Sequence, residues 1–398
     1  MRILAVLLPF LLSLSLPAQE RDLRIGIMRQ RSISSLLVMS SRGNCTVYAD
    51  GVRQGEIPLN DGLRIEATGH GLTAKSLKLN ISAKKRIEVV PRMAHSGVRL
   101  SLLGTKYPER SYPGAVEVQV SGGKLQLTNT APLEAYTAGV VQAEAGKEHH
   151  AEYYKLQSVS CRTYALCNQR KHAGEGFALC DAVHCQVFHG ICKQDSILHA
   201  VDATKGMVMV DPDIKMIHAL FHSNCGGETV NAEDLWSKQE PYLRSTADQY
   251  CLAAPHATWK KTLSKTEWLG YLERKFKVKV KDPVKQKALL NYEPNCRDLY
   301  LANIFPHIPL KAVREDLKLN STWFKISTTG DKVLLEGRGY GHGVGLCQEG
   351  SMRMAREGIN YLDILHHYYK DVHLMDISSL EFFREEEPMP AIAGPSRK

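Results

Sequence analysis

After its first 20 residues the sequence lacks an apolar run long enough to cross a bilayer, and it has no internal repeat. It also lacks a concentrated basic stripe, because the basic residues behind the formal charge of +9 are scattered, apart from a denser stretch at residues 260–287. Binding to nucleic acid needs such a stripe. We therefore expect no nucleic-acid partner and no membrane span in the mature chain. The surplus charge is either solvated or attracts an acidic polymer, such as one of the cell envelope.

The N-terminus has the pattern of a secretory signal peptide. Met1 and Arg2 precede an apolar run over residues 3–16, and small residues follow up to Ala18. This pattern predicts a signal peptide over residues 1–18. An uncleaved anchor is the alternative, but the run is short for a bilayer. Because no cysteine stands at the cleavage site, we expect no lipid-modified N-terminus. The protein should be exported to the periplasm, the cell envelope or the medium.

Alternating apolar residues predict a strand-rich, mixed α+β fold. Residues 24–127 consist of short alternating stretches separated by turn residues, which is typical of strands and hairpins. The clearest hairpin is residues 116–127, with Gly122 and Gly123 at its turn. After Pro132 the spacing becomes helical. We predict helices at residues 133–145, 151–170, 263–276, 350–357 and 361–369, with alternating strands between residue 276 and residue 335.

The chain, at 398 residues, is longer than one typical domain. We expect an N-terminal β-rich module over residues 19–111, after the signal peptide, and a helix-bearing region over residues 112–374. The last part, residues 375–398, is rich in glutamate and proline and should be a disordered tail.

The segment from Gly337 to Gln348 places five glycines around one histidine, His342, and one glutamine. Glycine loses more conformational entropy on folding than any other residue. A glycine cluster therefore marks backbone with positive φ, or backbone that closely approaches another group. Either interpretation predicts a functional site here, with His342 as a candidate catalytic residue.

Two charged residues stand in otherwise apolar helical stretches. Glu144 ends a stretch of small and apolar residues, where burial would raise the pKa of its carboxyl and suit it to general acid catalysis. A solvated residue at a helix end is the alternative. Arg162 needs a partner for its planar guanidinium, either a sugar oxygen or a carboxylate. A structural ion pair with Glu134 or Glu152 is the alternative for Arg162.

The ten cysteines allow up to five disulfides in an exported protein, and seven of them lie between Cys161 and Cys251. The compact group at Cys180, His184 and Cys185, with His172 upstream, has ligand types that zinc prefers. A disulfide is the competing interpretation. His184 and Cys185 are adjacent, so on an extended chain they would point in different directions. Other candidate ligands, His189 and Cys192, follow downstream.

Polar residues from Ser223 to Thr229 follow a predicted buried strand and end at a glycine turn, which is a usual place for substrate contacts. Trp236 and the segment from Pro241 to Arg244 come next. Aromatic faces beside hydrogen-bonding groups bind sugars well, although core packing explains an isolated tryptophan equally well.

Together these segments resemble the SpoIID/LytB family of bacterial cell-wall proteins, which includes peptidoglycan lytic transglycosylases of sporulation and amidase enhancers. Several separate motifs match in the family's order, between about Tyr112 and Val372. The matching stretches are Pro132–Glu144, Lys155–Leu166, Asp181–Gln186, Ser223–Thr229, Pro241–Arg244, Val313–Phe324 and Gly337–Gln348.

The resemblance implies that Glu144 is the catalytic acid and base, and that Arg162 and Tyr242 support catalysis or glycan binding. Arg244 stands where the family often has lysine. The resemblance also implies metal binding by Cys180 and Cys185 with a histidine as third ligand. His172 is our preferred third ligand, and His184 stays open.

The glycine-rich segment becomes the expected wall of a glycan cleft, in which Ser223, His342 and Gln348 contact the substrate. Cys347 stands where many relatives have serine, and Cys161 and Cys167 are also unusual. These departures suggest an added disulfide.

The implied reaction is non-hydrolytic cleavage of the β-1,4 bond between N-acetylmuramic acid and N-acetylglucosamine in peptidoglycan glycan strands. One carboxylate suffices, because the 6-hydroxyl of the muramic acid attacks its own anomeric carbon. Two alternatives remain open. The protein is either a non-catalytic glycan-binding enhancer of a cell-wall amidase, or a hydrolase in which the expected zinc is catalytic.

Overall fold

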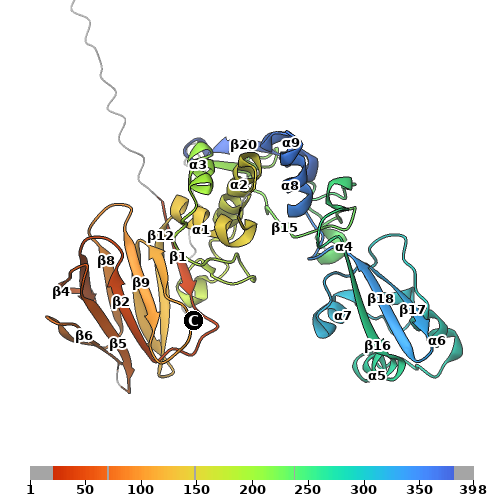
Figure 1. Ribbon diagram of the computed structural model, residues 1–398, viewed down its shortest axis with the longest axis horizontal. Coiled ribbons are helices and arrows are strands. Elements are labelled where there is room, and N and C mark those ends of the chain that lie inside the picture. The colour runs from red at the N-terminus through yellow and green to blue at the C-terminus, as the bar shows by residue number, and fades with distance from the viewer. Residues whose placement is uncertain (1–20, 70, 148, 237, 381–398) are drawn as a thin grey trace, which may run out of the picture.

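The computed structural model describes residues 21–69, 71–147, 149–236 and 238–380. The expected signal peptide lies outside these residues. Figure 1 shows an arch: the N-terminal strands stand on one side, helices form the top, and a small α/β unit stands on the other side. The predicted strand-rich, mixed α+β class is confirmed.

The N-terminal strands form two sheets that share one hydrophobic core. The seven-stranded sheet runs in the order β13 (Leu179–Cys180), β1 (Asp22–Ile27), β12 (Lys124–Pro132), β11 (Ala115–Ser121), β8 (Arg86–Pro91), β3 (Cys45–Ala49) and β4 (Val52–Ile57). The six-stranded sheet runs in the order β10 (Arg110–Pro113), β9 (Gly97–Leu102), β2 (Ser35–Ser40), β5 (Gly62–Thr68), β6 (Gly71–Lys75) and β7 (Asn80–Ala83).

The predicted hairpin at residues 116–127 is confirmed as β11 and β12. Ser121 pairs with Lys124, which leaves Gly122 and Gly123 as a two-residue turn. Their φ angles are 56° and 72°. Tight hairpin turns of this kind need positive φ at both central residues, and glycine adopts it without steric cost.

The expected boundary between residues 111 and 112 falls inside β10. Strands from both sides of it also share the seven-stranded sheet, because β11 pairs with β8 and β12 pairs with β1. The boundary therefore divides a sheet, and the reason is long-range pairing that local sequence patterns do not reveal.

The top of the arch is built from α1 (Leu133–Ala145), α2 (Ala151–Cys167) and α3 (Asp195–Ala203), together with α8 (Gln348–Arg356) and α9 (Tyr361–Tyr368). The prediction for α1 is confirmed with its bounds. Helix α2 ends three residues earlier than predicted, because the backbone N–H of Asn168 caps it on the carbonyl of Tyr164. Helix α1 continues directly from β12, so the sheet sets the direction in which α1 leaves it.

The small unit has its own hydrophobic core, centred on Trp268. Its sheet has the order β16 (Thr258–Ser264), β18 (Lys332–Arg338) and β17 (Phe324–Thr329). Three helices belong to it: α5 (Lys265–Phe276), α6 (Pro283–Leu290) and α7 (Leu310–Leu317). The prediction of alternating strands between residues 276 and 335 is confirmed for β17 and the start of β18 but is wrong before them, where α6 and α7 form. Asp282 caps α6 and Pro283 occupies its first turn, a helix-start signal that the many nearby lysines obscured.

Two short strand pairs connect distant parts of the chain. Strand β15 (Phe221–His222) pairs in parallel with β19 (Leu346–Cys347), which brings the glycine-rich segment beside the polar residues that follow β15. Strand β14 (Met207–Val210) pairs with β20 (His373–Asp376), so ordered structure extends past residue 375, the expected start of the tail. The short helices are η1 (Ala173–Glu175), α4 (Glu233–Trp236), η2 (Gln249–Cys251) and η3 (Leu301–Asn303).

Within the described residues, no helix combines the length and the apolar character needed to cross a membrane.

Candidate functional site

Glu144 lies in the last turn of α1, where its side chain is partly buried. Its Oε1 accepts a hydrogen bond of 2.6 Å from the backbone N–H of Val187. Burial raises the pKa of the Glu144 carboxyl, and the Val187 hydrogen bond opposes this shift only in part. Within the described residues, burial and the Val187 hydrogen bond are the two causes of the shift. A partly desolvated carboxyl with a raised pKa keeps its proton more readily and can act as a general acid.

The loop that contains Val187, the hydrogen-bond donor to Glu144, is itself bonded to α1 and α2. Gln186, which precedes Val187, is only 1% exposed. Its Nε2 donates to the carbonyl of Cys161 in α2 at 3.3 Å, and its Oε1 accepts from the hydroxyl of Tyr136 in α1 at 3.2 Å. These bonds fix the loop against α1 and α2. The position of the Val187 amide is therefore set by the same two helices that surround Glu144.

Gln348 meets Glu144 from the other end of the chain. Gln348 is the first residue of α8, and its Nε2 donates to the backbone carbonyl of Glu144 at 3.4 Å. The structure thus brings together two predicted site residues that lie 204 positions apart. The contact joins the end of the glycine-rich segment to the end of α1.

The glycines of this segment have the backbone geometry that the sequence predicted. Gly339, Gly341, Gly343 and Gly345 all have positive φ, between 72° and 112°. At Gly345 a Cβ atom would also lie 2.3 Å from the carbonyl oxygen of Leu220, which is a severe clash. Positive φ and the close approach to β15 together explain why glycine occupies these positions.

His342 is bonded through both ring nitrogens to backbone. Its Nε2 lies 2.9 Å from the carbonyl oxygen of Phe221, and its Nδ1 accepts from the N–H of Val344 at 3.1 Å. These partners fix the neutral tautomer with the proton on Nε2. Burial lowers the pKa of His342 to about 4. His342 therefore holds the glycine-rich segment against β15, and the initial expectation of a catalytic histidine is not supported.

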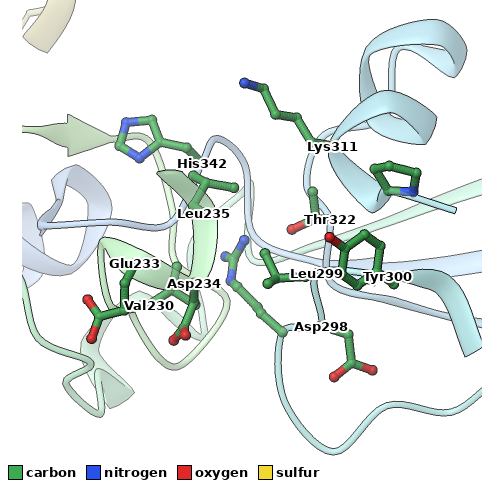
Figure 2. A pocket seen from close by; sticks show the side chains of 12 residues that line it. Val230, Glu233, Asp234, Leu235, Asp298, Leu299, Tyr300, Lys311, Thr322 and His342 are labelled. Atoms are coloured by element: carbon green, nitrogen blue, oxygen red, sulfur yellow. The ribbon is translucent and has the colours of Figure 1, made fainter. Parts of the chain in front are cut away.

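A pocket of about 200 Å³ lies beside His342. Figure 2 shows the segment that carries Glu233 and Leu235 on one side of it, and Tyr300 and Lys311 on the other. The pocket thus lies between the top of the arch and the small α/β unit. The ring of Trp236 is 5.3 Å from that of His342, centre to centre, and Trp236 is 39% exposed. This side offers aromatic and charged groups to a ligand.

Arg162 occupies a buried position between α1, α2 and β14. Its side chain is fully buried and forms a bidentate ion pair with Glu134, with Nη2 and Oε2 2.5 Å apart. Nη1 donates to the carbonyl of Met207 at 3.0 Å. The guanidinium therefore ties α2 to α1 and β14, which is the ion-pair alternative that the sequence left open.

Tyr242, Arg244 and Ser223 do not contact Glu144. The Tyr242 hydroxyl accepts from the backbone N–H of His218 at 3.1 Å, and its side chain is buried. Arg244 pairs with Glu233, with both guanidinium ends engaged at 2.6 and 2.5 Å.

Ser223 contributes its backbone carbonyl, which accepts from the N–H of Glu349 at the start of α8. Arg244 is linked to the His342 pocket through Glu233. The predicted site residues therefore divide into one group at Glu144 and another at His342.

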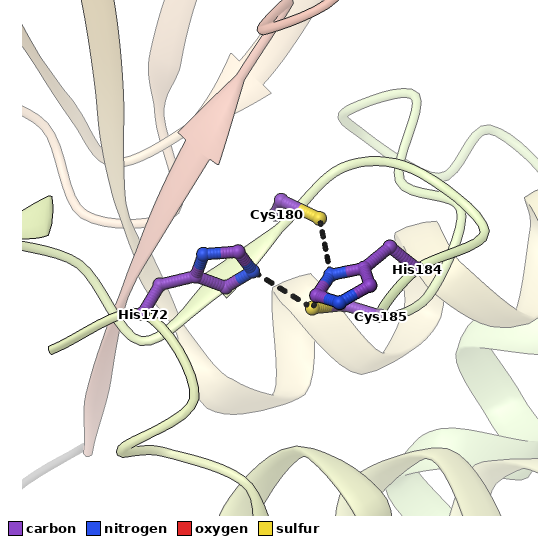
Figure 3. Close-up of side chains that lie close together, drawn as sticks. All are labelled: His172, Cys180, His184 and Cys185. Atoms are coloured by element: carbon purple, nitrogen blue, oxygen red, sulfur yellow. Dashed lines mark hydrogen bonds between the residues drawn. The ribbon is translucent and has the colours of Figure 1, made fainter.

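His172, Cys180, His184 and Cys185 converge on one point, as Figure 3 shows. The Sγ of Cys180 lies 3.8 Å from Nδ1 of His184, and the Sγ of Cys185 lies 3.4 Å from Nε2 of His172 and 3.7 Å from Nδ1 of His184. In a tetrahedral zinc site, the usual Zn–S and Zn–N lengths place such atoms about 3.6 Å apart. The four side chains fit zinc.

Both histidines that the sequence left open belong to this group. The backbone N–H of Cys185 bonds to the carbonyl of Ala182, and this turn directs the adjacent His184 and Cys185 toward the same point. The other ring nitrogen of His172 lies 2.5 Å from a carboxylate oxygen of Glu175. A carboxylate behind a histidine ligand is a usual feature of zinc sites. His189 and Cys192 lie outside the group.

Sequence reasoning missed one cluster. Cys225, Asp248, Cys251 and Cys347 are all fully buried and place their ligand atoms within 4.8 Å of one another. They are spread over more than 120 positions, so no local spacing reveals them. The signal in the sequence was the unusual Cys347.

Comparisons with known proteins agree with the resemblance in the sequence. The SpoIID family model, described as stage II sporulation protein, matches residues 121–210. Stage II sporulation protein D of Bacillus subtilis is 28% identical over 267 residues, covering 63% of this chain and 76% of that protein.

Two further relatives were found. An uncharacterized protein of Brachyspira hyodysenteriae is 29% identical over 271 residues, covering 66% of this chain and 71% of that protein. The amidase enhancer of Bacillus subtilis is 24% identical over 285 residues, covering 58% of this chain and 39% of that protein.

The fold and the matches define a mixed α+β protein with a cell-wall-related role. The matches support the resemblance of this chain to the SpoIID/LytB family.

Proposed function

We propose that the protein is a lytic transglycosylase that cleaves the β-1,4 bond between N-acetylmuramic acid and N-acetylglucosamine in peptidoglycan. One observation carries the proposal: the Glu144 carboxyl has a raised pKa and is fixed by the Val187 amide where α1 meets the glycine-rich segment. The surplus positive charge of the chain suits an acidic envelope polymer.

The hydrogen bond from Val187 to Oε1 leaves Oε2 of Glu144 for the reaction. Protonated Oε2 donates its proton to the glycosidic oxygen as the bond from C1 of the muramic acid breaks. The 6-hydroxyl oxygen of the same sugar then bonds to C1, and its proton passes to Oε2. The products are a 1,6-anhydro-muramic acid end and a free 4-hydroxyl, and the acid is regenerated.

A single carboxylate is consistent with this scheme. Ordinary glycosidases use two carboxyl groups, and in the retaining enzymes these lie only about 5–5.5 Å apart. At that distance a second carboxylate would raise the pKa of Glu144 through its charge. Among the described residues, burial is the cause that raises the pKa of Glu144. The attack by the substrate's own hydroxyl makes a second group unnecessary.

We also propose that His172, Cys180, His184 and Cys185 hold a structural zinc ion. Four protein ligands close the coordination sphere, whereas catalytic zinc keeps an open position for water. A zinc ion bound there would cross-link the loop and would not act as a Lewis acid. That loop continues from Cys185 into Gln186 and Val187, which fix Glu144. The closed ligand set gives the zinc hydrolase alternative less support.

The test is mass spectrometry of the products released from glycan strands without stem peptides. Wild-type protein should release 1,6-anhydro products, and Glu144→Gln should not. Glu273→Gln is the matched control, because Glu273 is exposed on α5 in the small unit. Full activity of a folded Glu144→Gln protein would refute the mechanism.

A second candidate function is supported by the amidase enhancer among the relatives. In this case the protein binds glycan strands and stimulates a cell-wall amidase without cleaving glycan itself. The same experiment separates the two functions. Binding to purified cell wall with faster amidase turnover, and without anhydro products, would favour the enhancer.

The signal-peptide pattern over residues 1–18 supports export to the periplasm, the envelope or the medium. Detection of the mature N-terminus at Gln19 in the envelope or medium fraction would test this.

A further inference from the structure

Cys225, Asp248, Cys251 and Cys347 come from three separate segments at the base of the glycine-rich segment. Cys225 follows β15, Asp248 and Cys251 belong to η2 and its cap, and Cys347 ends β19 and caps α8. All four are 0% exposed. The fold therefore gathers three thiols and one carboxylate in a place that water does not reach.

The distances suit one shared ion. The sulfur atoms of Cys225 and Cys251 are 3.3 Å apart, and the sulfur of Cys225 is 3.2 Å from Oδ2 of Asp248. Usual bond lengths in a tetrahedral zinc site place two sulfur atoms about 3.8 Å apart, and a sulfur and an oxygen about 3.5 Å apart. The cluster needs to expand by only about 0.5 Å to hold zinc. A disulfide would require the two sulfur atoms to approach to about 2.05 Å.

Hydrogen-bond donors surround the ligand atoms of the cluster. The backbone N–H groups of Cys225 and Gly350 both point at the sulfur of Cys347, at 3.3 and 3.4 Å. The Tyr368 hydroxyl donates to Oδ2 of Asp248 at 2.9 Å, and the N–H of Tyr250 donates to its Oδ1 at 3.0 Å. Such outer contacts orient ligand atoms in metal sites.

The partly buried guanidinium of Arg297 lies beside the cluster and has no acidic partner among the described residues. Nη2 of Arg297 donates to the carbonyl of Cys225 at 2.6 Å, while its buried Nε and Nη1 have no hydrogen-bond partner among the described residues. A buried charge is costly unless an opposite charge compensates it. Zinc bound to three thiolates and one carboxylate carries a net negative charge, which would compensate Arg297.

We propose that Cys225, Asp248, Cys251 and Cys347 form a second, structural zinc site. Zinc binding replaces the three thiol protons, which pass to solvent, and no electron is transferred. The ion would join the turn after β15, η2 and the start of α8. Because Gln348 follows Cys347 and contacts Glu144, the site would also hold the glycine-rich segment against α1.

The test is the zinc content of the full chain, purified without chelator under reducing conditions, for wild type and three variants. Cys251→Ser should lose one zinc per chain relative to wild type. Cys185→Ser should keep the zinc that Cys251→Ser loses. Cys296→Ser is the matched control, because Cys296 is exposed and outside both groups, and it should keep the wild-type content. This result does not depend on the proposed reaction.

A Cys251→Ser protein with the wild-type zinc content would overturn the proposal. So would wild-type protein with Cys225 and Cys251 resistant to alkylation and a mass two hydrogens lower, because that is the disulfide.

If Cys251→Ser fails to fold, cobalt-loaded Cys185→Ser decides. Strong thiolate-to-cobalt absorption in the near ultraviolet supports the second site, and its absence refutes it.

Discussion

Glu144 and His342 belong to the two separate groups of site residues. They differ in how many of their polar side-chain atoms already form hydrogen bonds. Glu144 has one carboxylate oxygen held by an amide and a pKa raised by burial. His342 has both ring nitrogens bonded to backbone and a pKa lowered to about 4 by burial. Burial disfavours the charged form in both cases, but within the described residues Oε2 of Glu144 makes no hydrogen bond, whereas both nitrogens of His342 do. A group can transfer protons only if it is not already engaged by the fold.

The largest expected effect separates these two residues directly. Glu144→Gln should reduce the release of anhydro products by about 10²- to 10⁴-fold, the usual contribution of a general acid or base. His342→Ala should retain much more activity, because it removes only a contact that positions the loop. Initial rates on glycan without stem peptides measure both. An equal loss in both variants, with both proteins folded, would contradict the comparison.

The next effect tests the structural role of Arg162, which links α2 to α1, the helix that carries Glu144. Arg162→Leu leaves Glu134 without its buried partner and should lower the free energy of unfolding by about 3–5 kcal/mol. Urea unfolding measures this. Arg244→Leu is the control, because its ion pair with Glu233 is partly exposed and should contribute about 1 kcal/mol or less. Equal destabilisation by the two changes would argue against the structural role.

A smaller effect concerns the contact between the glycine-rich segment and α1. Gln348→Leu removes the hydrogen bond to the Glu144 carbonyl and should lower the free energy of unfolding by about 0.5–1.5 kcal/mol. Activity should fall less than in Glu144→Gln, with the same products. Gln54→Leu, at an exposed position of β4, controls for the added apolar side chain. A Gln348→Leu protein as inactive as Glu144→Gln would give Gln348 a direct role in the chemistry.

The smallest effect is the pH dependence of stability, and its sign differs between the two residues. Glu144 binds its proton more tightly in the folded state, so its contribution to stability is lost as pH rises from about 4.3 through the raised pKa. His342 binds its proton less tightly, so its contribution is lost as pH falls from about 6.5 to about 4.

Unfolding free energies of wild type, Glu144→Gln and His342→Gln across this pH range isolate the two contributions. The difference between wild type and each variant should slope in opposite directions. Slopes of the same sign would show that one of the two pKa directions is wrong.

Local patterns predicted local structure well. The two glycines of the β11–β12 turn and the periodicity of α1 each specify their element within a few residues, and both predictions are confirmed. The helices α6 and α7 were missed, although Asp282 and Pro283 mark the start of α6. The boundary at residue 111 could not be placed from local patterns, because pairing between β11 and β8 joins residues almost 30 positions apart.

The contrast between local patterns and long-range contacts also explains why the sequence predicted some parts of the candidate site and missed others. The group at His172, Cys180, His184 and Cys185 spans 14 positions, so its spacing was visible in the sequence. The separation of the Glu144 and His342 groups was not visible. For Arg162 the sequence left the partner open between a sugar oxygen, Glu134 and Glu152, and the fold selects Glu134.

The sequence by itself determined the class of fold, the local metal-ligand pattern and the glycines that permit the backbone of residues 337–345. These follow from periodicity, ligand type and steric freedom, which are properties of neighbouring residues. Only the tertiary structure decided which polar atoms are already bonded. Among the described residues, long-range contacts engage Oε1 but not Oε2 of Glu144, bind both nitrogens of His342, and gather three cysteines and Asp248 at the base of the same segment.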